Sequence, residues 1–132
     1  IEGILNKATI VKFNETEIKD LTKKKKLEQA AEIIARYGPK IVLITLGERG
    51  CFLYSRSIKK FIESYREFIP VDKTGAGDAF SCGFILGGLK NWDLEKSAKF
   101  ANLIASISIT KIGARSVPSL KELKDYKEYN RF

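Results

Sequence analysis

The chain has 132 residues, with 24 basic and 16 acidic side chains, so its net charge is +8, and it contains no histidine. This length is typical of one domain, which argues against a two-domain enzyme and predicts one compact domain. Without an imidazole, histidine-based serine or cysteine catalysis and zinc sites with histidine ligands are excluded. Any catalytic base must therefore be a carboxylate or a lysine.

The cysteine count and the hydropathy pattern bear on where the protein resides. Cys51 and Cys82 are the only cysteines, too few for a disulfide framework or a four-cysteine metal site. We therefore predict two buried, unpaired thiols and a cytoplasmic protein. No apolar run approaches the ~20 residues that span a bilayer, which predicts no membrane partner. The chain lacks methionine and opens on Ile1 in a stretch typical of a helix end, so we interpret it as a piece of a longer protein.

The first part of the chain predicts a strand, a helix and a second strand. Residues 8–13 (ATIVKF) are apolar and rich in β-branched side chains, which predicts a strand that ends at Asn14. From residue 22 to residue 37 the apolar positions recur every three or four residues, which predicts a helix ending at Gly38. Residues 41–46 (IVLITL) are apolar without alternation, as in a strand buried on both faces, usually in a parallel sheet.

One dense basic run, residues 23–26 (KKKK), lies at the predicted start of this helix. Positive charge is mildly unfavourable there because of the helix dipole, so we interpret the run as a solvated face. Nucleic-acid binding favours basic residues interleaved with aromatic ones, or a recognised helix motif. Because neither is present, the sequence predicts no nucleic-acid partner.

The middle of the chain predicts the rest of a sheet. Gly47 and Gly50 bracket a tight turn that leads into a strand over residues 51–55 (CFLYS). Two further short strands are predicted over residues 58–64 and 67–71, so that the sheet continues to Val71.

The last part of the chain predicts helices. One follows the glycine-rich residues 74–77 and is predicted to end at residues 87–88 (GG). Asp93 is a suitable cap for a second helix that runs toward Gly113, and a short last helix is predicted over residues 119–129. The order of elements indicates an α/β fold with a sheet sandwiched between helices.

The stretch 71–80 (VDKTGAGDAF) joins the predicted sheet to a helix. Glycines let successive backbone N–H groups turn inward, and a helix N-terminus adds about half a positive charge, so this turn could hold a phosphate or another oxyanion. Asp78 lies beside it in the first helical turn, where it could accept a proton from a hydroxyl during phosphoryl transfer. Alternatively, Gly75 and Gly77 serve only a tight turn, and Asp78 only favours the helix N-terminus by ~0.3 to 1 kcal/mol.

The string TGAGDAF at residues 74–80 resembles the signature of the ribokinase-like carbohydrate kinases, the PfkB family. Three further segments resemble family motifs in the family's order. Residues 14–17 (NETE) are similar to its N-x-x-E motif, and residues 45–50 (TLGERG) to its T-L-G-x-x-G turn. Residues 113–118 resemble its closing G-A-x-x-x-P segment.

The resemblance implies roles for the first two motifs. In the family, Asn14 and Glu17 would organise Mg²⁺ and the phosphates of ATP, with Glu17 holding the metal through water. Thr45, Gly47 and Gly50 would lie against the nucleotide. Without the resemblance, the first two residues could simply cap the following helix, and residues 45–50 could be an ordinary hairpin turn.

The signature itself implies the catalytic groups. Gly75, Ala76 and Gly77 would form the anion hole, and Asp78 would be the base that deprotonates the sugar hydroxyl. Asn102 falls on the later helix where family members line the adenine site.

The closing segment implies a monovalent-cation site. A cation such as K⁺ would bind near Gly113, Ala114 and Ser116, with Asp72 as its side-chain ligand. The family commonly has threonine after this aspartate, whereas this chain has Lys73, so we predict weak dependence on potassium.

We therefore interpret the chain as the C-terminal, nucleotide-binding half of an ATP-dependent carbohydrate kinase. The family's N-terminal half, with most sugar contacts and the lid, is not present in residues 1–132, so the sugar and a homodimer formed through that half stay open. The isolated chain is predicted to bind MgATP weakly and to phosphorylate nothing. The alternative is a non-catalytic module that binds nucleotide, nucleic acid or another polyanion.

Overall fold

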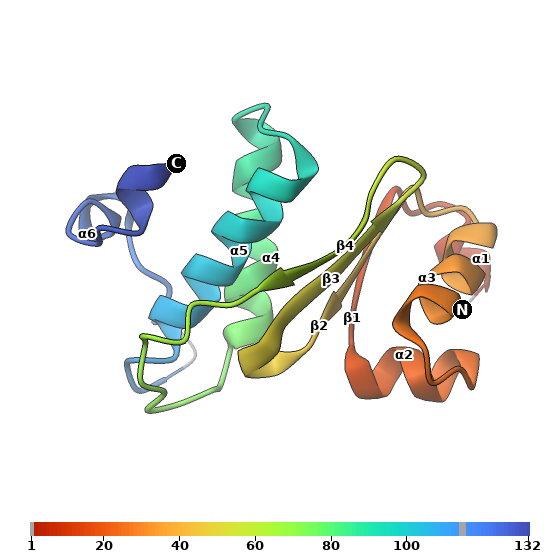
Figure 1. Cartoon of the computed structure of the whole chain (residues 1–132), viewed down its shortest axis with the longest axis horizontal. Coiled ribbons are helices and arrows are strands. Elements are labelled where there is room, and N and C mark those ends of the chain that lie inside the picture. The colour runs from red at the N-terminus through yellow and green to blue at the C-terminus, as the bar shows by residue number, and fades with distance from the viewer. Residues whose placement is uncertain (1, 114–115) are drawn as a thin grey trace. The chain divides into compact units, whose positions relative to one another are not determined.

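The computed structural model describes residues 2–113 and 116–132 (Figure 1). The chain divides into two compact units, one ending at Ile62 and the other beginning at Glu63, where one compact domain was predicted. None of the helices in the described residues combines the length and apolar character needed to traverse a lipid bilayer.

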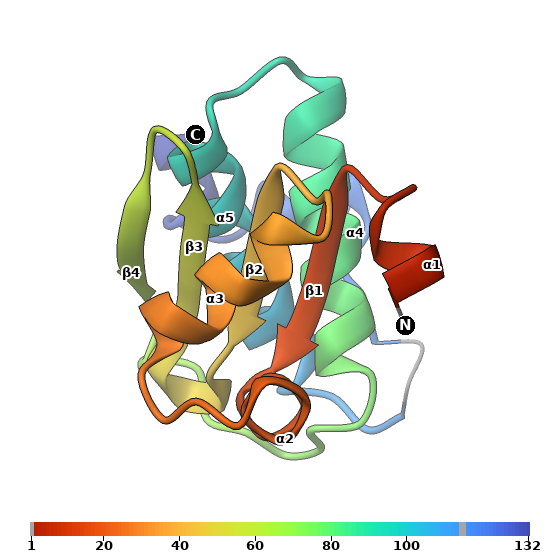
Figure 2. The same cartoon turned by 90° about the vertical axis from the view of Figure 1, so that its right-hand side faces the viewer.

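The first unit contains a mixed sheet of four strands in the order β1-β2-β3-β4 (Figure 2). β1 (Ile10–Asn14) and β2 (Ile41–Thr45) are parallel, and β2 is antiparallel to β3 (Gly50–Ser55). β4 (Lys59–Glu63) lies at the edge beside β3. The four predicted strands up to residue 64 are thus confirmed, although the first begins at Ile10 rather than at residue 8.

Three helices and a turn complete this unit. α1 (Glu2–Leu5) precedes the sheet, α2 (Glu15–Thr22) and α3 (Leu27–Arg36) connect β1 to β2, and the 3-10 turn η1 (Gly47–Arg49) connects β2 to β3.

The helix predicted over residues 22–37 is confirmed as α3, although it begins at Leu27, whereas α2 over Glu15–Thr22 was not predicted. α2 buries only Ile18, so its apolar periodicity is too weak to be read from the sequence. Lys23 ends α2 in the left-handed conformation, with φ 55°. The run 23–26 is exposed, as expected for a solvated face, but it links the two helices and precedes α3.

The core of this unit lies between the sheet and its helices. α3 covers one face of the sheet, with Ile34 packing in the same cluster as Val42 and Ile44 of β2 (Figure 2). Val42, Leu43 and Ile44 are all buried, which confirms the prediction of a strand covered on both faces.

The second unit is mainly helical. α4 (Ala76–Leu89) and α5 (Leu94–Ser108) lie side by side (Figure 1), followed by α6 (Leu120–Leu123) and the 3-10 turn η2 (Tyr129–Arg131). The predicted cap of α5 is confirmed, since Asp93 accepts a hydrogen bond from the Lys96 N–H. Ser119 caps α6 in the same way, accepting a hydrogen bond from the Glu122 N–H.

One predicted element of this unit is wrong and another is shorter than predicted. No strand forms over residues 67–71, because Pro70 has no N–H to donate to a neighbouring strand. The N–H of Val71 donates instead to the Ile109 oxygen at 2.7 Å. The last helix, predicted over residues 119–129, is a single turn.

Glycines allow α4 and α5 to approach closely. A Cβ built on Gly83 would lie 2.8 Å from the Ala101 Cα, and one on Gly87 would lie 2.6 Å from the Ser97 Oγ. α4 ends at Leu89, one residue beyond the predicted end at residues 87–88, and Gly87 also serves packing against α5.

The thiols differ from the prediction at one position. Neither cysteine forms a disulfide within the described residues, and Cys51 is buried in β3 as expected. Cys82, however, is exposed, because α4 packs against α5 through other residues such as Gly83 and Gly87.

Candidate functional site

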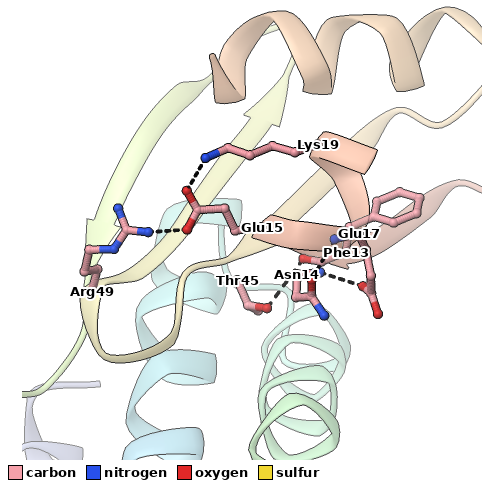
Figure 3. Close-up of polar contacts among 7 residues, drawn as sticks. All are labelled: Phe13, Asn14, Glu15, Glu17, Lys19, Thr45 and Arg49. Atoms are coloured by element: carbon pink, nitrogen blue, oxygen red, sulfur yellow. Dashed lines mark hydrogen bonds and ion pairs between the residues drawn. The ribbon is translucent and has the colours of Figure 1, made fainter. Parts of the chain in front are cut away.

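Two of the sequence motifs meet at the carboxyl ends of β1 and β2. In the parallel pairing, Asn14 is aligned with Thr45, and the Thr45 hydroxyl donates to the Phe13 oxygen at 3.4 Å (Figure 3). Ligands of open α/β sheets bind outside the carboxyl ends of the strands. The sheet therefore brings residues 14–17 and 45–50 to the edge where such a ligand would lie.

Asn14 and Glu17 form a reciprocal cap at the start of α2. The Glu17 N–H donates to the Asn14 Oδ1 at 2.8 Å, and the Asn14 N–H donates to the Glu17 Oε2 at 2.7 Å. The capping role left open by the sequence is thus confirmed. It uses one oxygen of each side chain, so the Asn14 amide nitrogen and the Glu17 Oε1 keep their capacity to bind a ligand.

The turn between β2 and β3 depends on its glycines. Gly47 and Gly50 have φ of 61° and 112°, which other residues rarely adopt. The Leu46 N–H donates to the Gly50 oxygen at 2.8 Å and closes the hairpin. A Cβ on Gly47 would meet no atom within 4 Å, so the face of the turn is open.

An ion-pair network that the motif patterns did not predict joins this turn to α2. The Arg49 guanidinium pairs with Glu15, and the Lys19 ammonium lies 2.5 Å from the same carboxylate (Figure 3). The hydrogen bond from Lys19 and the charge of Arg49 hold the pKa of the Glu15 carboxyl below its ordinary value. Both Glu15 and Arg49 stand at variable positions of their motifs, so no sequence signal connected them.

The third motif lies at the N-terminus of α4 in the second unit. Gly75 is the N-cap, with φ 81°, and no side chain caps the helix. The Ala76 N–H donates to the Lys73 oxygen at 3.3 Å. In the described part of the chain, the N–H groups of Gly77 and Asp78 have no acceptor. This end of α4 therefore presents unused donors together with the positive end of the helix dipole.

The Asp78 carboxylate differs from three other acids at helix starts. Glu17 and Glu122 each accept an N–H bond in a capping box, and Asp93 accepts one from the Lys96 N–H. Asp78 is exposed, and no described residue bonds to its carboxylate. A capping hydrogen bond thus does not explain this aspartate, and its carboxylate is available to a ligand.

Asp72 links this turn to the segment after α5. Its Oδ1 accepts the Thr74 N–H and its Oδ2 accepts the Gly113 N–H, each at 2.9 Å. These two bonds hold the pKa of the Asp72 carboxyl below its ordinary value. The Ser116 hydroxyl donates to the Gly113 oxygen at 2.7 Å, so the structure brings together Asp72, Gly113 and Ser116, while Ala114 lies outside the described residues.

Asn102 lies on α5 and is buried, with 3% of its surface exposed. Its side-chain amide donates to the Glu63 oxygen at 3.1 Å, a bond within the second unit. The adenine contact that the resemblance implied for this residue stays a prediction.

Comparison with known proteins relates these features to one family. The family model described as pfkB family carbohydrate kinase matches residues 1–121. A protein of Pyrococcus horikoshii, named as a candidate sugar kinase, is 40% identical over 130 residues, which make up 97% of this chain and 39% of that protein.

Solved structures agree with this match. A candidate ribokinase II from E. coli, in complex with ATP and Mg²⁺, has a TM-score of 0.86 and 26% identity, over 99% of this chain and 42% of that one. Fructokinase from Vibrio cholerae, with fructose, ADP and calcium bound, has a TM-score of 0.82 and 27% identity, over 93% of this chain and 42% of that one. This chain thus spans about two-fifths of the length of these relatives. The predicted ribokinase-like α/β fold is confirmed, and the chain belongs to the PfkB family of carbohydrate kinases.

Proposed function

We propose that the complete protein transfers the γ-phosphoryl group of ATP to a hydroxyl of a sugar or sugar-like alcohol, and that this chain supplies the nucleotide site, the anion hole and the catalytic base. The observation that carries the proposal is the N-terminus of α4. Among the described residues, the exposed Asp78 carboxylate there has no hydrogen-bond or ion-pair partner, and the neighbouring N–H groups of Gly77 and Asp78 have no acceptor.

Each group in this turn has a definite task in the proposed reaction. Asp78 takes the proton from the attacking hydroxyl, a contribution typically worth ~10²- to 10⁴-fold in rate. The N–H groups of Gly75, Ala76 and Gly77 are proposed to stabilise the negative charge on the transferred phosphoryl group, for which the Ala76 N–H would leave its long, 3.3 Å bond to the Lys73 oxygen. Phosphoryl transfer relies mainly on positioning and electrostatic stabilisation, so a glycine-rich helix start is well suited to it.

The first unit is proposed to bind the nucleotide phosphates and their metal. Mg²⁺ is usually bound through one or two carboxylates together with waters and phosphate oxygens, and the free Oε1 of Glu17 fits that requirement. The ion would neutralise phosphate charge when bound. The Asn14 amide nitrogen is proposed to donate to a phosphate, and Thr45, Gly47 and Gly50 to lie along the nucleotide. The ATP and Mg²⁺ in the E. coli relative support this choice of ligand.

The substrate class follows from the family, and the individual sugar stays open. Relatives of this chain are named for ribose and for fructose. Asp72, Gly113 and Ser116 are proposed to lie beside a monovalent cation, where the charge of Lys73 would reduce the need for potassium.

The test is Asp78→Asn in the complete enzyme, with Asp93→Asn as the matched control. Both changes replace a carboxylate at a helix start by an amide. Asp78 makes no capping bond that could be lost, and asparagine caps a helix as well as the N-cap Asp93 does. Asp78→Asn should lower sugar-dependent ADP formation at least about a hundredfold, because an amide cannot accept the proton. Affinity for MgATP should be equal or slightly tighter, the melting temperature nearly unchanged, and Asp93→Asn should retain its turnover.

One outcome would contradict the proposed role of Asp78 as the base. If Asp78→Asn keeps most of its turnover and loses stability, the aspartate is structural and another carboxylate is the base.

A further inference from the structure

The ion pair between Arg49 and Glu15 differs from most others in the described chain. Three of the other salt bridges in the described residues join residues four apart on one helix and support only that helix. Arg49 and Glu15 are 34 residues apart. They connect η1 to the first turn of α2, and so join the two motifs that end at the same edge of the sheet (Figure 3).

The turn that carries Arg49 lies at the surface, so an ion pair to α2 would restrict its movement. Positive-φ glycines flank it, and residues 47–49 are exposed. The Thr45 hydroxyl is 3.4 Å from the Phe13 oxygen, at the long limit of a hydrogen bond, so this contact holds the turn weakly. Arg49, with 58% of its side chain exposed, reaches from the end of the turn back to the better covered Glu15, which is 28% exposed.

Other contacts hold the Glu15 carboxylate in position to pair with Arg49. Its Oε1 bonds to the Lys19 ammonium, which leaves Oε2 directed at the guanidinium. Its place in the first turn of α2 is also favourable for a negative charge. Glu15 directly follows Asn14, so a group fixed to Glu15 is fixed relative to the Asn14–Glu17 cap as well.

From this geometry we infer that Arg49 and Glu15 are positioning residues, which hold the β2–β3 turn against α2 in the arrangement that receives the nucleotide. The inference rests on the proposed function, because it assigns the turn to ATP. Neither residue is assigned a contact with the nucleotide itself. Any effect of either residue on the KM for MgATP should therefore depend on the ion pair and should be lost when either partner is replaced.

The experiment is a double-mutant cycle in the complete enzyme with Glu15→Gln, Arg49→Gln and the double variant. Each single change should raise the KM for MgATP about two- to fivefold, the range that an exposed ion pair can supply, with kcat nearly unchanged. The double variant should be no worse than either single one. Arg49→Lys should restore most of the affinity, as should the charge reversal Glu15→Lys with Arg49→Glu.

A control and a second readout separate this inference from the proposed function. Arg36→Gln breaks an exposed pair with Glu32 on α3 and should leave the KM unchanged. Amide hydrogen exchange at Leu46 and Gly50 should become faster in both single variants, whether or not the enzyme is active. If the unaltered enzyme phosphorylates sugars and either single variant matches it in KM and in exchange, or if the two effects add in the double variant, the inference is wrong and the proposed function stands. An unaltered enzyme without ATP-dependent turnover contradicts the proposed function itself.

Discussion

Two adjacent glycines of α4 should respond in opposite directions to the same substitution. A Cβ on Gly87 would lie 2.6 Å from the Ser97 Oγ and 2.9 Å from its Cα, whereas a Cβ on Gly88 would meet nothing within 4 Å. Ser97 cannot easily turn away, because its hydroxyl donates to the Asp93 oxygen at 2.8 Å. Gly87→Ala must therefore push α4 away from α5.

The magnitudes follow from the balance of packing and chain entropy. Overpacking a tight contact costs about 1 to 3 kcal/mol, and alanine recovers roughly 0.5 to 1 kcal/mol over glycine inside a helix. The net effect of Gly87→Ala should be a loss of about 1 to 2 kcal/mol in the free energy of unfolding. Gly88→Ala meets no steric contact, so it should only reduce the entropy of the unfolded chain and raise the free energy of unfolding by about 0.4 to 1 kcal/mol.

Denaturant unfolding of the complete protein measures both changes, provided that the slope m is unchanged. Adding Ser97→Ala to Gly87→Ala should restore only part of the loss, because the Ser97 Cβ and Cα also lie within 3 Å of the new methyl group. The reasoning is refuted if Gly87→Ala is as stable as the unaltered protein, or if Gly88→Ala is the more damaging of the two.

Two further predictions concern acid and potassium. The Ser119 N–H, and then the Lys111 ammonium and the Ser119 hydroxyl, lower the pKa of Glu122 from 4.5 to about 2, so its stabilisation is present above pH 4.5 and is lost as the pH falls toward 2. The melting temperature of Glu122→Gln should fall less steeply than that of the unaltered protein over this range, and equal slopes would contradict the prediction. Because Lys73 places a positive charge next to Asp72, the complete enzyme should depend little on potassium and Lys73→Thr should depend on it more; strong potassium activation of the unaltered enzyme would argue against this role for Lys73.

The sequence predicted the features that depend on short-range patterns. The apolar run of β2 and the signature at residues 74–80 were recognisable because each is a compact local signal. α2 was missed since one buried residue, Ile18, gives too little periodicity to compete with the stronger pattern of α3.

Contacts between residues far apart in the chain were harder to predict from the sequence. Resemblance pointed to Asp72 and the segment after Gly113 together, but the bond between them depends on where α5 ends. The Arg49–Glu15 pair depends on the register of two parallel strands, which neither motif encodes by itself. The Gly87 contact likewise depends on how closely two helices approach, a distance that a pair of glycines permits without specifying it.

The bonds around Asp72 also bear on how ordered the ligand-free turn is. A helix start without a capping side chain would ordinarily fray. Here the N–H groups of Val71 and Asp72 donate to the Ile109 oxygen, and the Asp72 carboxylate accepts the Gly113 N–H. These hydrogen bonds connect the segment before α4 to the segment after α5. Opening either end therefore requires breaking these bonds. An anion bound at the proposed site in this turn would meet amide groups already held in place, so its binding would cost less chain entropy.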